Sequence, residues 1–485
     1  MDLFELLSDH FLNLPRPNAE LGVPAGIVDT TTLAAHDFDV DTRTGFMPPQ
    51  PPLTRLPEQW ESWERALDDA RAQKLQLGGK PGVSEEEKNS VGLMAGPYPG
   101  VSTSELNQSE LMLRRAHHVL TWIMHFYIHS VPPSSSAEIR IPAPITIPLL
   151  QICAQLQLPP VVTYSDDVLY NWALKSPPSE PTDTAPQLAP ALDNLRSLTL
   201  FTGTKDEEEF YLTSARMELR GVEALELMRA TMDELFVGDA IAYRRTTRYL
   251  HALARVIDDL TVLLLSVRDG CRPDVFYNDI RPWFRGADSS SERRKWVFEG
   301  LEEHPELAAP TELSGTSAAQ SSLVHALDIF LGVDEYSHSN SLTGDYAPRP
   351  TASSSASASA SGSDRPKISF LTRMQAYMPR HHRNFLRHLS ADPRPVRDTV
   401  MEGKDAELMD AYNAAVTSLK LFRDAHIRIV ALYIIGPSRK IGGEPVGANE
   451  AEKKALLKGT GGTDLVKFLK GVRDRTAEAV IENEN

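Results

Sequence analysis

Long stretches with the periodicity of an α-helix run through the second half of this 485-residue chain. Apolar side chains recur every three to four residues over roughly 206–236, 238–268, 319–332, 369–389 and 405–435. This spacing places the apolar residues on one face of a helix. The alternation that is typical of strands is sparse throughout. The sequence therefore predicts a mainly α fold.

Two shifts in composition indicate how the chain is organised, since it is too long for one simple core. The stretch 175–190 is rich in proline and predicts an exposed linker. We therefore expect a smaller N-terminal domain over 1–190, α with minor β, and a large helical domain over 191–485. The Ser/Ala tract at 348–366 is predicted to be a disordered insertion, because it has too few apolar side chains to fold.

Charge and cysteine content exclude several classes of protein. The chain has 66 Asp and Glu against 50 Lys and Arg, a formal charge of −16, which argues against nucleic-acid binding and docking on an anionic membrane. Its N-terminus lacks the signal-peptide pattern, and no apolar run is long enough to span a bilayer. Cys153 and Cys271 have no CxxC spacing, which argues against disulfides and structural zinc. We expect a cytoplasmic protein.

One histidine, His426, lies within the apolar segment "RDAHIRIVALYI" (423–434). On a helix its neighbours include Leu419, Phe422 and Ile429. Burying an imidazole costs free energy unless its nitrogens find partners. A core histidine satisfied by hydrogen bonds is the commoner explanation, and a metal ligand is the alternative.

Other motifs compete with His426. His125 and His129 form an HxxxH pair that could share a metal, but no Glu follows the first histidine as HExxH requires, and aromatic neighbours favour packing. The segment "GTGGTD" (459–464) lacks the GK[ST] ending of a phosphate loop and better suits a flexible lid. GxSxG and GxGxxG motifs are absent. None of these motifs defines a site alone.

Seven segments together resemble the indoleamine 2,3-dioxygenase family, with a fungal-type member expected. They occur in order over nearly the whole chain, and the resemblance is weak before about residue 38. The segments are "LPPVVTYSDDVLYNW" (158–172), "FYLTSARMEL" (210–219), "VFYNDIRPWF" (275–284), "GTSAAQSSLVHALDIFLG" (315–332), "YMPRHHRNFL" (377–386), "RDAHIRIVALYI" (423–434) and "KGTGGTDLVKFLK" (458–470).

The resemblance implies a two-domain haem fold and an oxidoreductase. Members open the indole ring of L-tryptophan across C2–C3, insert both atoms of O₂, and give N-formylkynurenine. This is the first step of tryptophan catabolism by the kynurenine pathway, towards NAD synthesis. The cofactor is haem b, with ferrous iron in the active state and O₂ as co-substrate. An external electron donor, related indoleamines as further substrates and a monomeric state are also expected.

The resemblance also implies roles for residues around the cofactor. His426 matches the proximal iron ligand, whose second ring nitrogen is oriented by an acceptor. Arg423 is expected to pair with Asp328 and so tie together the two helices of the proximal wall. An ordinary interhelical ion pair would have the same geometry. The remaining contacts to the haem are expected from Val168, Ser214, Ser317 and Ala318.

For the substrate, the resemblance implies a clamp and an aromatic slot. Arg281 matches the arginine that binds the carboxylate, for which a bidentate guanidinium is suited. Ser214 would offer one weak hydrogen bond close to the oxygen, and it is the second expected catalytic residue. The other expected substrate contacts are Tyr164, Phe210, Phe276, Tyr277 and Thr460.

Two positions depart from the family pattern. Position 167, often small or cysteine-like in relatives, is Asp here, which places a carboxyl near the pocket. Tyr277 replaces a common phenylalanine and adds a hydroxyl that needs a partner. Two alternatives stay open. An oxygen carrier or sensor would keep His426 without needing Arg281 or Thr460, and a helical scaffold would bind no cofactor.

Overall fold

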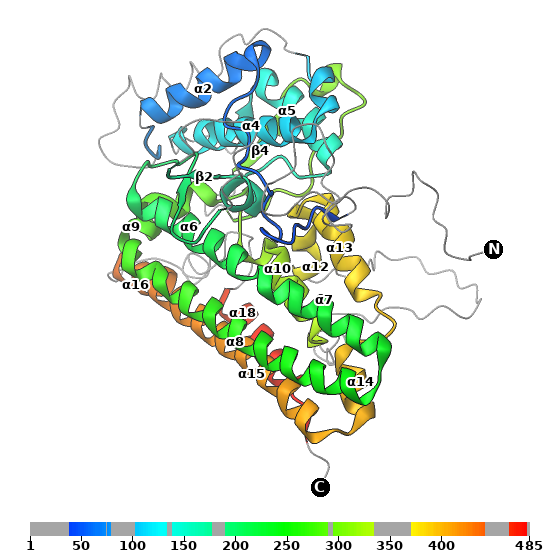
Figure 1. The fold of residues 1–485 in the computed structure, drawn as a ribbon. Helices are drawn as coiled ribbons and strands as arrows, with labels where there is room; N and C mark the ends of the chain where they lie inside the picture. Colours follow the sequence, from blue (N-terminus) through cyan, green and yellow to red (C-terminus); the bar gives the residue numbers. More distant parts are fainter. Residues whose placement is uncertain are drawn as a thin grey trace, which may run out of the picture.

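The computed structural model describes residues 38–73, 75–78, 102–132, 138–176, 190–289, 294–333, 370–441 and 465–482. Its elements are mostly helices, which confirms the mainly α prediction (Figure 1). The Ser/Ala tract at 348–366, Thr460 and most of the predicted linker lie outside the described residues.

Four long helices form the lower half of the molecule as drawn in Figure 1. They closely follow the periodic stretches, and α15 packs along α8 while α6 and α7 contact α8 as well. Asp239 and Asp405 cap α8 and α15 by accepting hydrogen bonds from two backbone N–H groups each. The four helices are α6 (Lys205–Arg220), α7 (Val222–Val237), α8 (Ala240–Gly270) and α15 (Ala406–Val430).

The predicted stretch 206–236 is two helices rather than one, because the chain breaks at Gly221. A Cβ atom at Gly221 would lie 2.2 Å from Leu323 Cδ2, so only glycine permits this close approach. Leu323 belongs to α10 (Ser322–Phe330), which is thereby held against the junction of α6 and α7.

Shorter helices complete the C-terminal part. The predicted stretch 369–389 divides into α12 (Phe370–Met374) and α13 (Arg380–Ser390), with Pro379 as the N-cap residue of α13. The remaining helices are α9 (Pro273–Val275), α14 (Val396–Gly403), α16 (Gly436–Ile441) and α18 (Leu465–Glu478).

The described N-terminal part contributes three α-helices and one strand to each of two small sheets. Helices α2 (Glu61–Ala72), α4 (Glu110–Ser130) and α5 (Ala143–Leu156) lie at the top of Figure 1. Strand β1 (Glu138–Ile141) pairs in parallel with β4 (Lys295–Phe298), and β2 (Trp172–Leu174) pairs antiparallel with β3 (Leu195–Ser197). Each sheet joins segments from both sides of residue 190, and the division into domains there stays a prediction.

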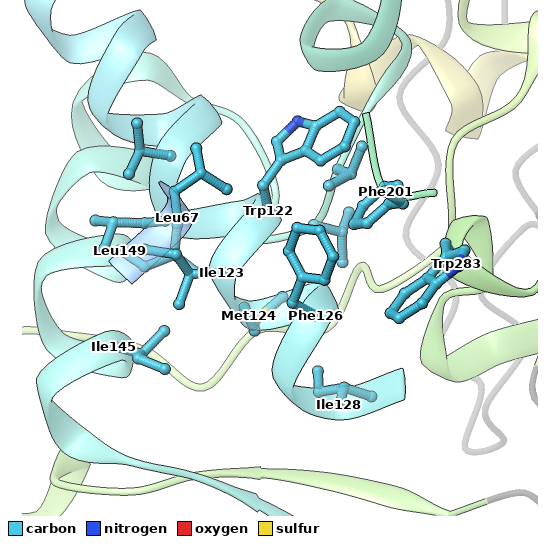
Figure 2. Packing of buried hydrophobic residues seen from close by; sticks show 14 of the residues in the cluster. Leu67, Trp122, Ile123, Met124, Phe126, Ile128, Ile145, Leu149, Phe201 and Trp283 are labelled. Carbon is cyan, nitrogen blue, oxygen red and sulfur yellow. The ribbon is translucent and has the colours of Figure 1, made fainter. Parts of the chain in front are cut away.

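Two clusters of buried apolar side chains form the core. One gathers α2, α4 and α5, and the other gathers α7, α8, α10 and α15. In the first cluster Phe201 stacks between two indole rings, with ring centroids 3.9 Å from Trp122 and 5.3 Å from Trp283 (Figure 2). Trp283 lies on the short 3-10 helix η6 (Arg281–Phe284), so this stack fixes the turn that carries Arg281.

No helix within the described ranges is both long enough and apolar enough to cross a bilayer.

Candidate functional site

A large apolar cavity lies where the two core clusters meet. Its empty space, including the open mouth, is about 1230 Å³. The walls come from α6, α8, α12, α15, α18, η6, the segment 316–319 and three π-helical turns. Nine of the residues expected at the site line it, namely Tyr164, Val168, Phe210, Ser214, Phe276, Arg281, Ser317, Ala318 and His426.

Three π-helical turns contribute to this lining. They are η4 (Ser165–Leu169), η5 (Phe276–Ile280) and η11 (Ala431–Ile435). A π turn inserts an extra residue into the helical repeat and changes the direction of the side chains that follow, and such turns are frequent at functional sites. Val168, Phe276 and Tyr433 line the cavity from these turns.

His426 projects from α15 into the cavity. The residue is partly buried, and desolvation, with Arg423 nearby, lowers its pKa to about 4. The imidazole is therefore neutral at pH 7. Among the described residues no hydrogen bond to either ring nitrogen is present, so the orienting acceptor expected from the family is not found there. A neutral imidazole of this kind, aimed into an apolar space, is suited to bind a metal.

The histidines of α4 are engaged elsewhere. His125 Nδ1 donates to the Trp283 carbonyl over 2.9 Å while its Nε2 accepts from Val162 N–H over 3.2 Å. His129 Nε2 lies 3.0 Å from the Arg285 carbonyl. No group of three or more His, Cys, Asp or Glu side chains able to hold a metal occurs in the parts of the chain that the structure describes. The HxxxH pair therefore links α4 to η6 and the chain just beyond it.

An aromatic slot forms one side of the cavity. The ring of Phe210, on α6, lies 4.6 Å from that of Phe276 and 5.8 Å from that of Phe284, measured between centroids. Ser214 is one helical turn after Phe210 and lines the same cavity. Met217, three residues further along α6, packs among apolar side chains of the second cluster.

Arg281 lines the cavity and is 4% exposed. Burial, reinforced by the charge of Arg285, lowers its pKa to about 10, so it stays cationic at neutral pH. Its guanidinium carbon lies 5.7 Å from the ring centroid of Tyr277. Tyr277 itself is outside the lining and supports the arginine rather than the cavity wall.

Arg423 and Asp328 form the expected ion pair between α15 and α10. Both are buried, at 7% exposure each, and the Arg423 guanidinium also reaches the Val472 carbonyl of α18 over 3.5 Å. Neither side chain lines the cavity. Their place in cofactor binding stays a prediction, and their observed contacts tie together three helices around His426.

Polar groups also gather at the cavity wall. The Tyr164 hydroxyl donates to Glu218 Oε1 over 2.8 Å. Asp167 lines the cavity and accepts at Oδ2 a hydrogen bond of 2.9 Å from the Thr316 hydroxyl. Asp167 was singled out from the sequence as a departure, but its partner Thr316 was not.

Several lining residues were not predicted as site residues. They are mostly apolar, and in the sequence they look like ordinary core positions of amphipathic helices. The π turns and the approach of α18, which decide that they face a cavity, leave no signal in a single sequence. These residues are Thr213, Leu264, Val267, Phe284, Thr316, Ala319, Phe370, Ile429, Val430, Tyr433, Ile434, Leu465, Phe468 and Leu469.

Comparison with known proteins places the chain in a family. The family profile "Indoleamine 2,3-dioxygenase" matches residues 34–479. The indoleamine 2,3-dioxygenase of Saccharomyces cerevisiae is 32% identical, covering 92% of this chain and 94% of the relative. Indoleamine 2,3-dioxygenase 1 of Mus musculus is 28% identical over 92% and 95% of the two chains. The 6-hydroxytryptophan 2,3-dioxygenase fscD of Fusarium equiseti is 29% identical, covering 91% of this chain and 97% of the relative. The chain belongs to the indoleamine 2,3-dioxygenase family.

Proposed function

We propose that the protein is a haem-dependent dioxygenase that inserts both atoms of O₂ across the C2–C3 bond of L-tryptophan to give N-formylkynurenine. The observation that carries the proposal is the neutral imidazole of His426, which faces a large apolar cavity without a hydrogen-bond partner among the described residues. Family membership supports the reaction class. The first step of the kynurenine pathway, towards NAD synthesis, would follow from this chemistry.

The residues present fit a haem b group. The cavity offers one nitrogen ligand, His426, and mostly aliphatic and aromatic walls, which suit an apolar macrocycle. Val168, Ser317, Ala318 and Ser214 would contact it, and the Arg423–Asp328 pair would hold α15 in place. When bound, ferrous haem supplies the site at which dioxygen is activated, a chemistry that no protein side chain provides.

The chain turns two phenolic protons away from the cavity. The Tyr164 hydroxyl donates to Glu218, and the Tyr433 hydroxyl donates to the Cys271 carbonyl. His426 is the only histidine of the lining among the described residues, which leaves no distal imidazole to act as an acid. These features would remove phenols and a second imidazole as acids that could protonate bound oxygen.

Arg281 would bind the substrate carboxylate. It is cationic, buried and held by the stack of Trp283 on Phe201, so its fork is preorganised for a bidentate contact. The indole would enter the slot formed by Phe210, Phe276 and Phe284. Thr460 would close over the substrate from the segment "GTGGTD", outside the described residues.

The alternative is a haem-binding oxygen carrier or sensor that does not turn over tryptophan. A buried arginine in the cavity wall favours the enzyme, because a carrier of O₂ has no carboxylate to bind. An external electron donor, related indoleamines as substrates, a cytoplasmic location and a monomeric state complete the proposal.

The test is an assay of the haem-loaded protein for N-formylkynurenine, with ascorbate and methylene blue as reductants. We expect product from L-tryptophan in the wild type. Haem-loaded protein that forms no product would favour the carrier.

In the same assay Arg281→Ala should raise the KM for tryptophan roughly 100-fold, because two charge-assisted hydrogen bonds are lost. Haem content should stay that of the wild type, and Arg281→Lys should recover part of the loss by restoring the charge without the fork. Loss of haem in step with activity would show that Arg281 is structural instead.

A further inference from the structure

One polar spot interrupts the apolar lining of the cavity. Asp167 from η4, Thr213 from α6 and Thr316 all line it. Each is nearly buried, at 3%, 3% and 5% exposure. Because η4 packs on α6, the first two residues come from neighbouring elements. The proposed reaction uses none of the three.

Two buried polar atoms at this spot have no partner within the described residues. They are Oδ1 of Asp167 and the hydroxyl oxygen of Thr213. Oδ2 of Asp167, by contrast, accepts from Thr316 over 2.9 Å, which fixes the orientation of the carboxyl group. Buried polar atoms are nearly always hydrogen-bonded in folded proteins. The Asp167 carboxyl thus lies in the cavity wall with one oxygen hydrogen-bonded and the other without a described partner. This arrangement points to a polar group on a ligand that supplies the missing hydrogen bond.

The Asp167 carboxyl is suited to meet a neutral polar group. Burial raises its pKa well above the ordinary value, the Thr316 hydrogen bond only partly opposes this, and the neighbouring charge of Asp166 adds to it. Burial thus favours the neutral acid over the carboxylate, while Thr316 donates to Oδ2 and leaves Oδ1 as the oxygen without a described partner. A protonated carboxyl can donate to, or accept from, a hydroxyl group.

We infer that Asp167, oriented by Thr316, determines substrate specificity by hydrogen-bonding a polar group on the indole ring system, and that the preferred substrate is a ring-hydroxylated tryptophan. This rests on the proposed function, since it assumes that the cavity receives an indole amino acid. An unsubstituted benzo ring would cover Asp167 with carbon and leave Oδ1 unsatisfied. A site built to hydrogen-bond a hydroxyl discriminates strongly against the analogue that lacks it.

The experiment compares L-tryptophan, its 1-methyl derivative, and the 5-hydroxy and 6-hydroxy derivatives on the haem-loaded protein. Product formation gives kcat/KM, and calorimetry gives Kd without requiring turnover. We expect at least one hydroxylated substrate to exceed tryptophan by roughly 10- to 100-fold in both quantities. If the 1-methyl compound alone loses affinity, the polar group that is bound is the indole N–H, and the inferred hydroxyl preference is wrong.

Variants test whether Asp167 is responsible. Asp167→Leu should invert the preference, lowering kcat/KM for the hydroxylated substrate while raising it for tryptophan, because the unsatisfied carboxyl is gone. Asp167→Asn, neutral and similar in shape, should keep most of the preference, and Thr316→Val should lose part of it. Ser197→Ala removes another buried hydroxyl that has no hydrogen-bond partner among the described residues. It lies outside the cavity lining, so the ratio of the two kcat/KM values should stay unchanged.

The outcomes separate the two proposals. If tryptophan is turned over and the ratio is the same in wild type and Asp167→Leu, the inference is overturned and the proposed function stands. If no indole is turned over or bound by haem-loaded protein, both fail. Haem content and melting temperature show whether Asp167→Leu folds. If it does not, the test uses Asp167→Asn and Thr316→Val, and compares kcat/KM for the hydroxylated substrate with kcat/KM for tryptophan in each variant. A Thr316→Val variant with the wild-type ratio of these two values would contradict the inference.

Discussion

Helices α4 and α15 both bury histidine, but they do so in opposite ways. On α4, His117, His118, His125 and His129 each have at least one hydrogen-bond partner, from Asp166, Thr199, Trp283 and Arg285 respectively. On α15, His426 has none within the described ranges and faces the cavity. The helix with more histidines is thus the one without a site.

The contrast shows what distinguishes a structural from a ligand histidine. Histidines that connect elements have their nitrogens directed at backbone carbonyls or side chains across a helix interface. A ligand histidine keeps a nitrogen available at a cavity and is kept neutral by burial, because a protonated imidazole cannot bind a metal. This property belongs to the folded environment, since "HFYIH" and "DAHIR" look equally buried in sequence.

The largest expected difference is in haem binding. His426→Ala should weaken haem affinity by roughly 100-fold or more, because removal of an outer partner alone costs 10- to 100-fold at metal sites. His129→Gln should retain wild-type affinity, since a glutamine N–H can still donate to the Arg285 carbonyl. Titration of apoprotein with haem, followed at the Soret band, measures both. Equal haem affinities in the two variants would contradict the assignment of His426 as a ligand and His129 as a structural histidine.

For the stability of the apoprotein we expect the opposite ranking: replacing a histidine of α4 should cost more stability than replacing His426. His125→Leu removes two hydrogen bonds and leaves Val162 N–H and the Trp283 carbonyl buried without partners, which should destabilise the fold by about 3 kcal/mol. His426→Leu leaves no protein group unsatisfied among the described residues and should be neutral or stabilising. The melting temperatures of the two variant apoproteins, compared with that of the wild type, test this ranking. A larger loss for His426→Leu would mean that this imidazole is a core residue.

Acid should destabilise the fold through two histidines of α4, His118 and His125. Burial lowers the pKa of His125 to about 4 and, with Arg115 nearby, that of His118 to about 3. A lowered pKa of a base means that the unfolded state, with an ordinary value of ~6.5, binds more protons. The stabilisation is complete above pH ~6.5 and is lost as pH falls. His125 alone should lose about 2 kcal/mol of stability between pH 7.5 and 5.

The measurement for this prediction is the pH dependence of apoprotein melting. His125→Gln should melt at a lower temperature than the wild type at pH 7.5 but show a shallower decline towards pH 5, because the titrating group is gone. Thr121→Ser serves as the control, because it changes a buried residue of the same helix without removing a titrating group. A decline of unchanged steepness in His125→Gln would show that other groups govern acid unfolding.

The predictable and unpredictable parts of this protein differ in kind. The periodic stretches located α8 and α15, and local cues such as Asp239 and Asp405 fix their starts. The resemblance to a family identified His426, Arg281 and the partners of the Arg423–Asp328 pair. In each case the signal lies in residue types at a fixed spacing.

Features that depend on long-range packing left no such signal. The break at Gly221 lies where Leu323, about a hundred residues later, packs against the glycine, a contact that the local period does not reveal. Tyr277 was expected beside the indole, but the π turn η5 places it outside the lining. The Asp167–Thr316 bond joins residues that are 149 positions apart, and only the fold brings them together.

The central claim is that iron is bound by the imidazole of His426. Resonance Raman spectroscopy of the ferrous haem-loaded protein, prepared with ordinary or ¹⁵N-labelled histidine, tests this bond directly. We predict an iron–nitrogen stretching band that shifts to lower frequency with the label, is retained in His129→Gln and is absent from His426→Ala. A band that is insensitive to the label, or one that survives in His426→Ala, would contradict it.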